Sequence, residues 1–243
     1  MKEFKNIPVI ILHGWNLSAD KFTPLVKEFK KRGFNTYSLD LPGFGKSEFP
    51  DRPYYLSDYV AFVLEYIRKN KFRKIILIGH SFGGRISVKL AAGNPKYLFA
   101  LILTGAPGIN PVPPAKIRFY LIMAKAGNLL LSFPGLSLIK DKARKLLYRI
   151  ARASDFYNTN EKMRETFKNI IKENLVPYLS EIKVPTLLLW GADDKIVPLE
   201  IARKMNKYIN NSEVVAVPGT RHGLPWTSPE KFRREVEKYL SKI

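Results

Sequence analysis

The sequence contains no cysteine and only three histidines, and it lacks any long uncharged apolar run. Without cysteine the chain has no disulfide, no thiolate metal site and no cysteine nucleophile, which fits a reducing compartment. The longest apolar candidate, residues 129–139, is interrupted by Pro134-Gly135 and is too short to cross a bilayer. The apolar run at residues 7–12 is also too short for a secretory signal and indicates a buried strand. We therefore expect a soluble, cytoplasmic protein.

Acidic residues are scarce: 21 Asp and Glu stand against 41 Lys and Arg, which gives a formal net charge of +20 at pH 7. Such a charge can attract nucleic acid, anionic lipid or acidic substrates. Here the basic residues are spread along every predicted helix, and no nucleic-acid-binding motif accompanies them. We therefore interpret them as a solvated surface and expect no nucleic-acid partner.

The apolar residues that are present form short runs separated by amphipathic stretches. A chain of 243 residues, 46% hydrophobic and 26% charged, can bury one good-sized core. The alternation is typical of a mostly parallel sheet covered by helices on both faces, which is the α/β class. Strands are predicted at residues 9–12, 36–39, 75–78, 100–103, 186–190 and 214–217.

Two of the intervening helices have clear signatures. One shows an apolar stripe at helical spacing, formed by Tyr59, Phe62, Val63, Tyr66 and Ile67. The final helix is predicted to begin with Ser228 as its N-cap and Pro229 at its first position. Its apolar face consists of Phe232, Val236, Tyr239 and Leu240.

The alternation of strands and helices fails between about Pro107 and Lys183. This stretch opens with Pro111-Val112-Pro113-Pro114 and continues as several helical patterns without a strand signal. It is too long for a loop within a compact domain. We predict a core formed by residues 1–106 and 183–243, with a helical cap inserted at residues 107–182.

The most informative segment runs from Ile75 to Gly84, where a buried strand leads into Gly79-His80-Ser81-Phe82-Gly83 and then a helix. A serine hydroxyl needs a base to take its proton, and it must protrude toward the substrate. A sharp strand-to-helix turn provides this protrusion, and the flanking glycines avoid clashes between crowded side chains. In this context the sequence resembles the α/β-hydrolase superfamily, and the resemblance covers nearly the whole chain.

The resemblance assigns Ser81 as the nucleophile, Asp194 as the acid and His222 as the base. Asp194 matches the family pattern of Gly-x-x-Asp followed by an apolar residue and Pro, and its neighbour Asp193 is the rival. His222 lies in a loop after the last predicted strand, before the last helix. The order serine, aspartate, histidine, each after a separate strand, is the one expected of this fold.

The family also implies an oxyanion hole formed by two backbone N–H groups, those of Trp15 and Phe82. We expect His13 and His80 to hold these loops by hydrogen bonds rather than to act in catalysis. The Trp15 side chain is interpreted either as a pocket wall or as packing. The Asp40–Ser47 loop also matches a family pattern, and its Pro and glycines indicate a structural role.

The implied function is a serine hydrolase that cleaves carboxylic esters of small-molecule substrates through an acyl-enzyme on Ser81. A lactonase, a C–C bond hydrolase and an aminopeptidase would use the same triad and remain alternatives, as does a non-catalytic binding relative. No cofactor or metal is expected, because no cluster of ligands has suitable spacing. The predicted cap is both apolar and basic, which leaves contact with an anionic membrane as a further hypothesis. Its basic residues are Lys140, Lys142, Arg144, Lys145, Arg149 and Arg152.

Overall fold

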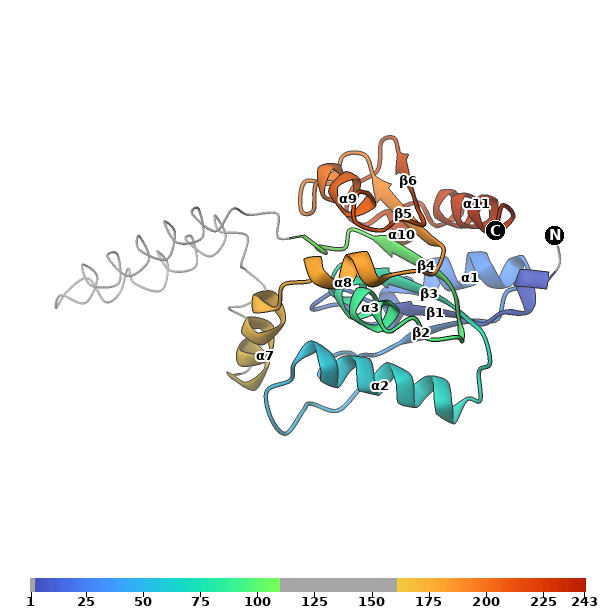
Figure 1. Cartoon of the computed structure of the whole chain (residues 1–243). Helices are drawn as coiled ribbons and strands as arrows, with labels where there is room; N and C mark the ends of the chain where they lie inside the picture. The colour runs from blue at the N-terminus through green and yellow to red at the C-terminus, as the bar shows by residue number, and fades with distance from the viewer. Residues whose placement is uncertain (1–2, 110–160) are drawn as a thin grey trace.

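The computed structural model describes residues 3–109 and 161–243, and their core is a single parallel sheet (Figure 1). All six predicted strands are present, and four of them extend by one to three residues beyond the predicted limits. These short runs form strands because nearly every residue in β1, β3, β4 and β5 is buried, so both faces must be apolar. The strands are β1 (Val9–Leu12), β2 (Thr36–Leu39), β3 (Ile75–His80), β4 (Leu98–Thr104), β5 (Thr186–Gly191) and β6 (Ser212–Val217).

Helices connect the strands, and two short 3₁₀ turns lie near the N-terminus. The 3₁₀ turns are η1 (Glu3–Asn6) and η2 (Ala19–Phe22). The first half of the sheet is connected by α1 (Thr23–Lys31), α2 (Leu56–Lys69) and α3 (Phe82–Ala92). The described helices of the second half are α7 (Glu161–Lys172), α8 (Val176–Glu181), α9 (Leu199–Asn206), α10 (Leu224–Thr227) and α11 (Pro229–Leu240).

The strand order is β2-β1-β3-β4-β5-β6, and every pair is parallel. The register aligns the ends of neighbouring strands. Leu12 is paired with both Leu39 and Gly79, and His80 is paired with Thr104. As a result the loops that follow all six strands leave from one edge of the sheet.

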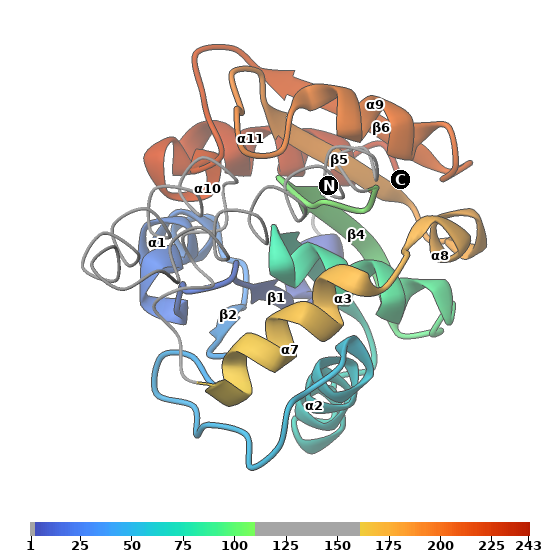
Figure 2. The same ribbon diagram turned by 90° about the vertical axis from the view of Figure 1, so that its left-hand side faces the viewer.

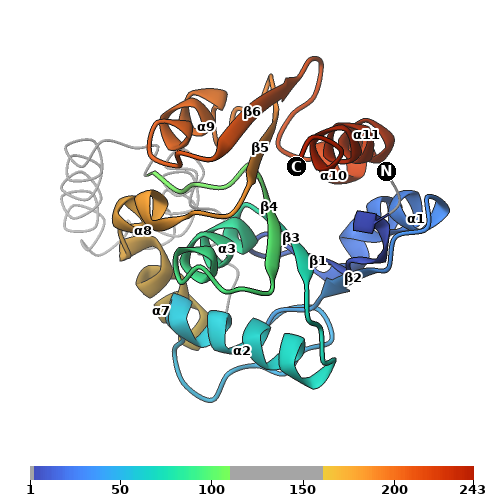
Figure 3. The ribbon, with the colours of Figure 1, turned by 45° about the vertical axis from the view of Figure 1, so that its right-hand side comes forward.

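Two apolar clusters cover the two faces of the sheet. Figure 3 shows the helices that lie over these faces. On one face α1 and α11 pack together, with Leu25 and Phe29 in the same cluster as Phe232 and Val236. The other face is covered by α2, α3, α8 and α9. Each large apolar side chain buried in this way contributes about 1.5–3 kcal/mol relative to exposure.

The two helices with clear sequence signatures are confirmed. In α2 the apolar stripe faces the core, with Tyr59, Val63 and Ile67 buried and the flanking Phe62 and Tyr66 half-buried. Helix α11 begins at Pro229, with Ser228 at the N-cap position as predicted. The Ser228 side chain, however, makes no capping hydrogen bond.

The predicted cap, residues 107–182, falls largely on residues 110–160, which lie outside the described part of the chain. Its remaining portion is helical in α7 and α8, and Figure 2 shows α7 alongside α2 and α3. The boundaries between core and cap stay a prediction. Across the described ranges, none of the helices is both long enough and apolar enough to span a membrane.

Candidate active site

The site predicted from the sequence lies where the direction of the sheet connections reverses. Strand β1 pairs with β2 on one side and with β3 on the other. The chain leaves β1 toward α1 on one face and leaves β3 toward α3 on the opposite face. In open parallel sheets the crevice at such a point is where ligands bind. Trp15 follows β1 and Ser81 follows β3, so both sit at this crevice.

Ser81 joins β3 directly to α3 with a strained backbone. Its dihedral angles are φ 51° and ψ −112°, a conformation that few residues other than glycine adopt. The turn is held by the Ser81 N–H, which donates to the Thr104 carbonyl at 3.0 Å, and by the Gly84 N–H, which donates to the Ser81 carbonyl at 3.0 Å. Strain of this kind costs about 1–3 kcal/mol and persists only where the surroundings enforce it.

The glycines around Ser81 are required because the backbones approach closely. A Cβ atom at Gly79 would lie 2.4 Å from the Ser87 hydroxyl oxygen. One at Gly83 would lie 2.3 Å from the Leu12 carbonyl oxygen. The predicted reason for these glycines, the avoidance of clashes, is therefore confirmed at both positions.

Asp194 and His222 are brought together from the loops after β5 and β6. The Asp194 Oδ2 atom accepts a hydrogen bond from His222 Nδ1 at 2.7 Å. The side chain of Asp194 is 1% exposed and that of His222 is 15% exposed. The other carboxylate oxygen accepts the backbone N–H groups of Ile196 and Val197 at 2.8 and 2.9 Å. The rival Asp193 is exposed.

Ser81 and His222 approach the same stretch of backbone at the end of β4. The backbone N–H of Ser81 donates a hydrogen bond to the Thr104 carbonyl. In the next residue, a Cβ atom at Gly105 would lie 2.7 Å from Cε1 of His222. The hydrogen bonds of the described residues do not include one between the Ser81 hydroxyl and His222. Such bonds are often long without substrate and shorten when it binds.

The two other histidines are buried and hold neighbouring loops through hydrogen bonds, as the sequence predicts. His13 Nδ1 donates to the Gly14 carbonyl at 2.7 Å, and its Nε2 accepts the Leu41 N–H at 3.0 Å. His80 Nε2 donates to the His222 carbonyl at 3.1 Å, and the two rings lie 4.7 Å apart. Burial lowers the pKa of His13, and burial together with the neighbouring His222 holds the pKa of His80 well below its ordinary value. Both rings are therefore neutral at pH 7.

Trp15 and Phe82, the predicted oxyanion donors, lie against each other, with ring centroids 5.4 Å apart. Their loops are joined because the Gly83 N–H donates to the His13 carbonyl at 3.0 Å. Neither the Trp15 N–H nor the Phe82 N–H donates to another described residue. The Trp15 ring packs among the rings of Phe44, Phe82 and Phe167, so packing accounts for its side chain.

The loop after β2 has the structural role that its sequence indicates. The carboxylate of Asp40 accepts the N–H groups of Ala19 and Lys46 at 2.7 and 3.0 Å. Gly43 and Gly45 both have positive φ, at 86° and 59°. Beside this loop lies an open hollow of about 750 Å³, lined by Asn16, Leu17, Ser18, Asp20, Lys21, Gly43, Phe44 and Gly45.

Sequence reasoning missed Arg85, which lies one helical turn after Ser81. It is 8% exposed and donates hydrogen bonds to three backbone carbonyls. The only signal in the sequence is a charged residue that stands between Gly83-Gly84 and Ile86-Ser87 near the start of the helix. Pro225 and Trp226 form part of α10, and the Trp226 ring packs on His80.

Within residues 3–109 and 161–243, no group of three or more His, Asp or Glu side chains is arranged to hold a metal ion.

Comparison with known proteins identifies the family. A family model of the alpha/beta hydrolase fold matches residues 7–229, which is most of the chain. The chain belongs to the α/β-hydrolase-fold family. The parallel sheet, the strained turn at Ser81 and the order of the three predicted catalytic residues agree with this assignment.

Relatives within the α/β-hydrolase family are hydrolases of more than one kind. The bifunctional esterase/perhydrolase DCH of Acinetobacter calcoaceticus is 26% identical over 97% of this chain and 92% of its own length. A 2-hydroxy-6-oxononadienedioate/2-hydroxy-6-oxononatrienedioate hydrolase of Cupriavidus pinatubonensis is 25% identical over 96% of this chain and 86% of its own. An esterase from Exiguobacterium antarcticum has a similar structure, with a TM-score of 0.75 at 22% identity over 98% of this chain and 92% of that one. By family, this chain is a hydrolase.

Proposed function

We propose that this protein is a serine hydrolase that cleaves carboxylic esters through an acyl-enzyme on Ser81. The hydrogen bond of 2.7 Å between Asp194 and His222 is the observation that carries the proposal. It pairs a buried carboxylate with a partly exposed imidazole, as a general base requires. The strained backbone at Ser81 supports the nucleophile, because such strain clusters at functional sites.

In the proposed first step, His222 Nε2 takes the proton of the Ser81 hydroxyl while its oxygen attacks the ester carbonyl. Asp194 holds the Nδ1–H and stabilises the imidazolium that forms. The N–H groups of Trp15 and Phe82 stabilise the negative charge on the carbonyl oxygen. The imidazolium then protonates the departing alcohol, and the acyl group stays on Ser81. In the second step His222 activates a water molecule that releases the carboxylic acid and restores the serine.

The chemical class of the substrate is proposed from similarity to known hydrolases and not from the residues of the cap. The similarity to an esterase/perhydrolase supports ester cleavage, and the similarity to a hydrolase of 2-hydroxy-6-oxo dienedioates supports C–C bond cleavage as the alternative. A lactonase or aminopeptidase would use the same three residues. Most of the predicted cap, with its basic residues, lies outside the described part of the chain, so membrane contact stays a prediction.

Hydrolysis of p-nitrophenyl esters from acetate to palmitate tests the proposal. We expect wild type to cleave short or medium esters and Ser81→Ala to lose about 10⁴-fold or more of kcat. The matched control is Ser57→Ala, an exposed serine on α2, which should retain full activity. The chain length that is cleaved fastest gives the size of the acyl pocket.

An inactive wild type would be examined next with a fluorophosphonate probe, which labels an activated serine. If this inactive wild type is labelled and Ser81→Ala is not, Ser81 is an activated serine whose substrates are not simple esters. That result would favour the lactone, C–C or peptide alternatives. Absence of both activity and labelling would overturn the serine hydrolase proposal in favour of a binding relative.

A further inference from the structure

Arg85 joins three segments of backbone that are far apart in the sequence. Its Nη1 donates to the Pro107 carbonyl at 2.8 Å, and its Nη2 donates to the carbonyls of Ile170 and Glu173 at 2.7 and 2.6 Å. Pro107 follows β4, whereas Ile170 lies in the last turn of α7 and Glu173 directly follows that helix. The arginine belongs to α3, and its own N–H donates to the Ser81 carbonyl at 3.3 Å. One side chain therefore connects the nucleophile helix to α7.

These contacts suit an arginine and no other residue. The last four carbonyls of an α-helix have no partner within the helix, and Ile170 supplies one of them in α7. The guanidinium also places positive charge at the negative end of the helix dipole. Its planar fork serves several acceptors at once, which a lysine ammonium cannot do with the same geometry. Although burial lowers the pKa of Arg85 to about 10, the group stays charged at neutral pH.

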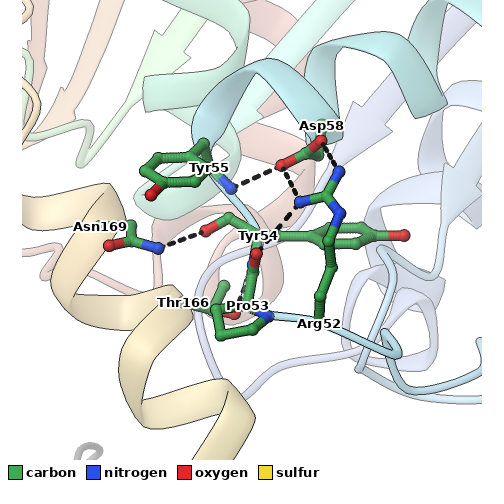
Figure 4. Close-up of polar contacts among 7 residues, drawn as sticks. All are labelled: Arg52, Pro53, Tyr54, Tyr55, Asp58, Thr166 and Asn169. Atoms are coloured by element: carbon green, nitrogen blue, oxygen red, sulfur yellow. Dashed lines mark hydrogen bonds and ion pairs between the residues drawn. The ribbon is translucent and has the colours of Figure 1, made fainter.

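A second anchor holds the middle of α7 (Figure 4). The Thr166 hydroxyl accepts the Tyr54 N–H at 2.9 Å, and Asn169 Nδ2 donates to the Tyr54 carbonyl at 3.3 Å. Tyr54 lies in the segment before α2, where Arg52 and Asp58 form an ion pair at 2.6 Å. Helix α7 is thus fixed along its length, at its end by Arg85 and near its centre by Tyr54.

Held by these two anchors, α7 packs one face against the loop after β1, which carries Trp15. The Phe167 ring lies 5.0 Å from the Trp15 ring, and Phe44 and Phe82 enclose the same indole from other sides. One turn earlier, Met163 is so close to Gly43 that a Cβ atom there would lie 2.7 Å from its sulfur. The position of Trp15 therefore depends on α7 as well as on the loops after β1 and β2.

We propose that Arg85 is a positioning residue that holds α7 on the nucleophile helix, so that Phe167 fixes Trp15 and its N–H in the oxyanion hole. The inference rests on the proposed function, because it takes the Trp15 N–H as an oxyanion donor. Arg85 acts through α7 and Phe167 and does not touch the reacting atoms.

A kinetic double-mutant cycle on p-nitrophenyl acetate tests this route. We expect Arg85→Met and Phe167→Ala each to lower kcat by about 10- to 100-fold, less than the loss of an oxyanion donor, with KM changed by less than about threefold. Because both act on Trp15, the double variant should be little slower than either single variant. Arg85→Lys should recover only a small part of the loss. The control is Lys89→Met, which removes the ion pair of Lys89 with the Glu173 side chain and should leave kcat near wild type.

Hydrogen exchange at 25 °C provides a readout that does not depend on activity. In Arg85→Met we expect faster exchange in residues 161–173 and unchanged exchange in β3. Losses of kcat that add in the double variant, or an Arg85→Met that lowers only the melting temperature, would overturn the inference while leaving the proposed function intact. A wild type with neither esterase activity nor fluorophosphonate labelling would overturn both.

Discussion

Asp194 offers a direct test at the scale of single residues, because its neighbour Asp193 is a natural control. Asn at position 194 keeps the shape of the side chain but removes the charge that stabilises a protonated His222. We expect Asp194→Asn to lower kcat by about 10⁴-fold, since the imidazole is then held in the wrong tautomer. Asp193→Asn, at an exposed position, should stay within about twofold of wild type in the same p-nitrophenyl acetate assay. The reverse ranking would assign the acid to Asp193.

Residues differ in how far the sequence could predict their roles. Asp194 and His222 follow strands in the order of the family that the sequence resembles, so the resemblance could anticipate their pairing. Arg85 could not be anticipated, because its three partners are backbone carbonyls, and a carbonyl carries no sequence signature. The contact between Phe167 and Trp15 likewise joins positions with no shared periodicity, and only the tertiary fold brings them together.

At the scale of elements, two helix starts are expected to differ in energy. In α2 the Asp58 carboxylate accepts the Tyr55 N–H at 2.7 Å, whereas the Ser228 hydroxyl makes no such bond at the start of α11. Removing a working cap costs about 1 kcal/mol. Asp58→Ala also removes the exposed ion pair with Arg52, which contributes at most about 1 kcal/mol. We therefore expect Asp58→Ala to lower the free energy of unfolding by about 1–2 kcal/mol, and Ser228→Ala to lower it by less than about 0.5 kcal/mol. Urea denaturation measures both, and an equal loss would contradict the assignment of the caps.

The elements themselves were well predicted where burial dictates them. The four central strands, β1, β3, β4 and β5, are apolar runs buried on both faces, so no alternative structure would bury them as well. The edge strands β2 and β6 are only partly buried. The ends of the strands were less accurate, because β3 and β4 continue to His80 and Thr104 through pairing with each other rather than through apolar character. The N-cap at Ser228 was placed correctly, but its hydrogen bond depends on backbone angles that composition does not determine.

At the scale of the whole molecule, two buried neutral histidines make folding stability depend on pH. His13 and His80 both have a pKa lowered from the usual value of 6.5 in the folded protein. Below pH 6.5 the unfolded chain therefore binds protons that the folded chain does not. The free energy of unfolding should be greatest above pH 6.5 and should fall as the pH decreases, by at most about 2.7 kcal/mol per pH unit for two protons.

Urea denaturation between pH 7.5 and 5 tests this dependence in a range above the titration of most carboxylates. His80→Gln keeps a donor for the His222 carbonyl and removes one titrating ring. Its slope should be shallower by up to about 1.4 kcal/mol per pH unit. A slope equal to that of wild type would show that His80 takes up its proton without unfolding.

The crowding at the turn around Ser81 limits which substitutions this protein can accept during evolution. No side chain fits at Gly79, Gly83 or Gly84 unless β1, α3 or the backbone near Ala106 moves. The aromatic residues around Trp15 come from the loop after β2, from the first residue of α3 and from α7. Phe82 belongs to the turn itself and Phe167 fixes Trp15 under our proposal, so both are under the same constraint as the glycines. Lineages and laboratory libraries alike are therefore expected to keep the turn and these aromatic residues, and to acquire new substrates through changes elsewhere in the chain.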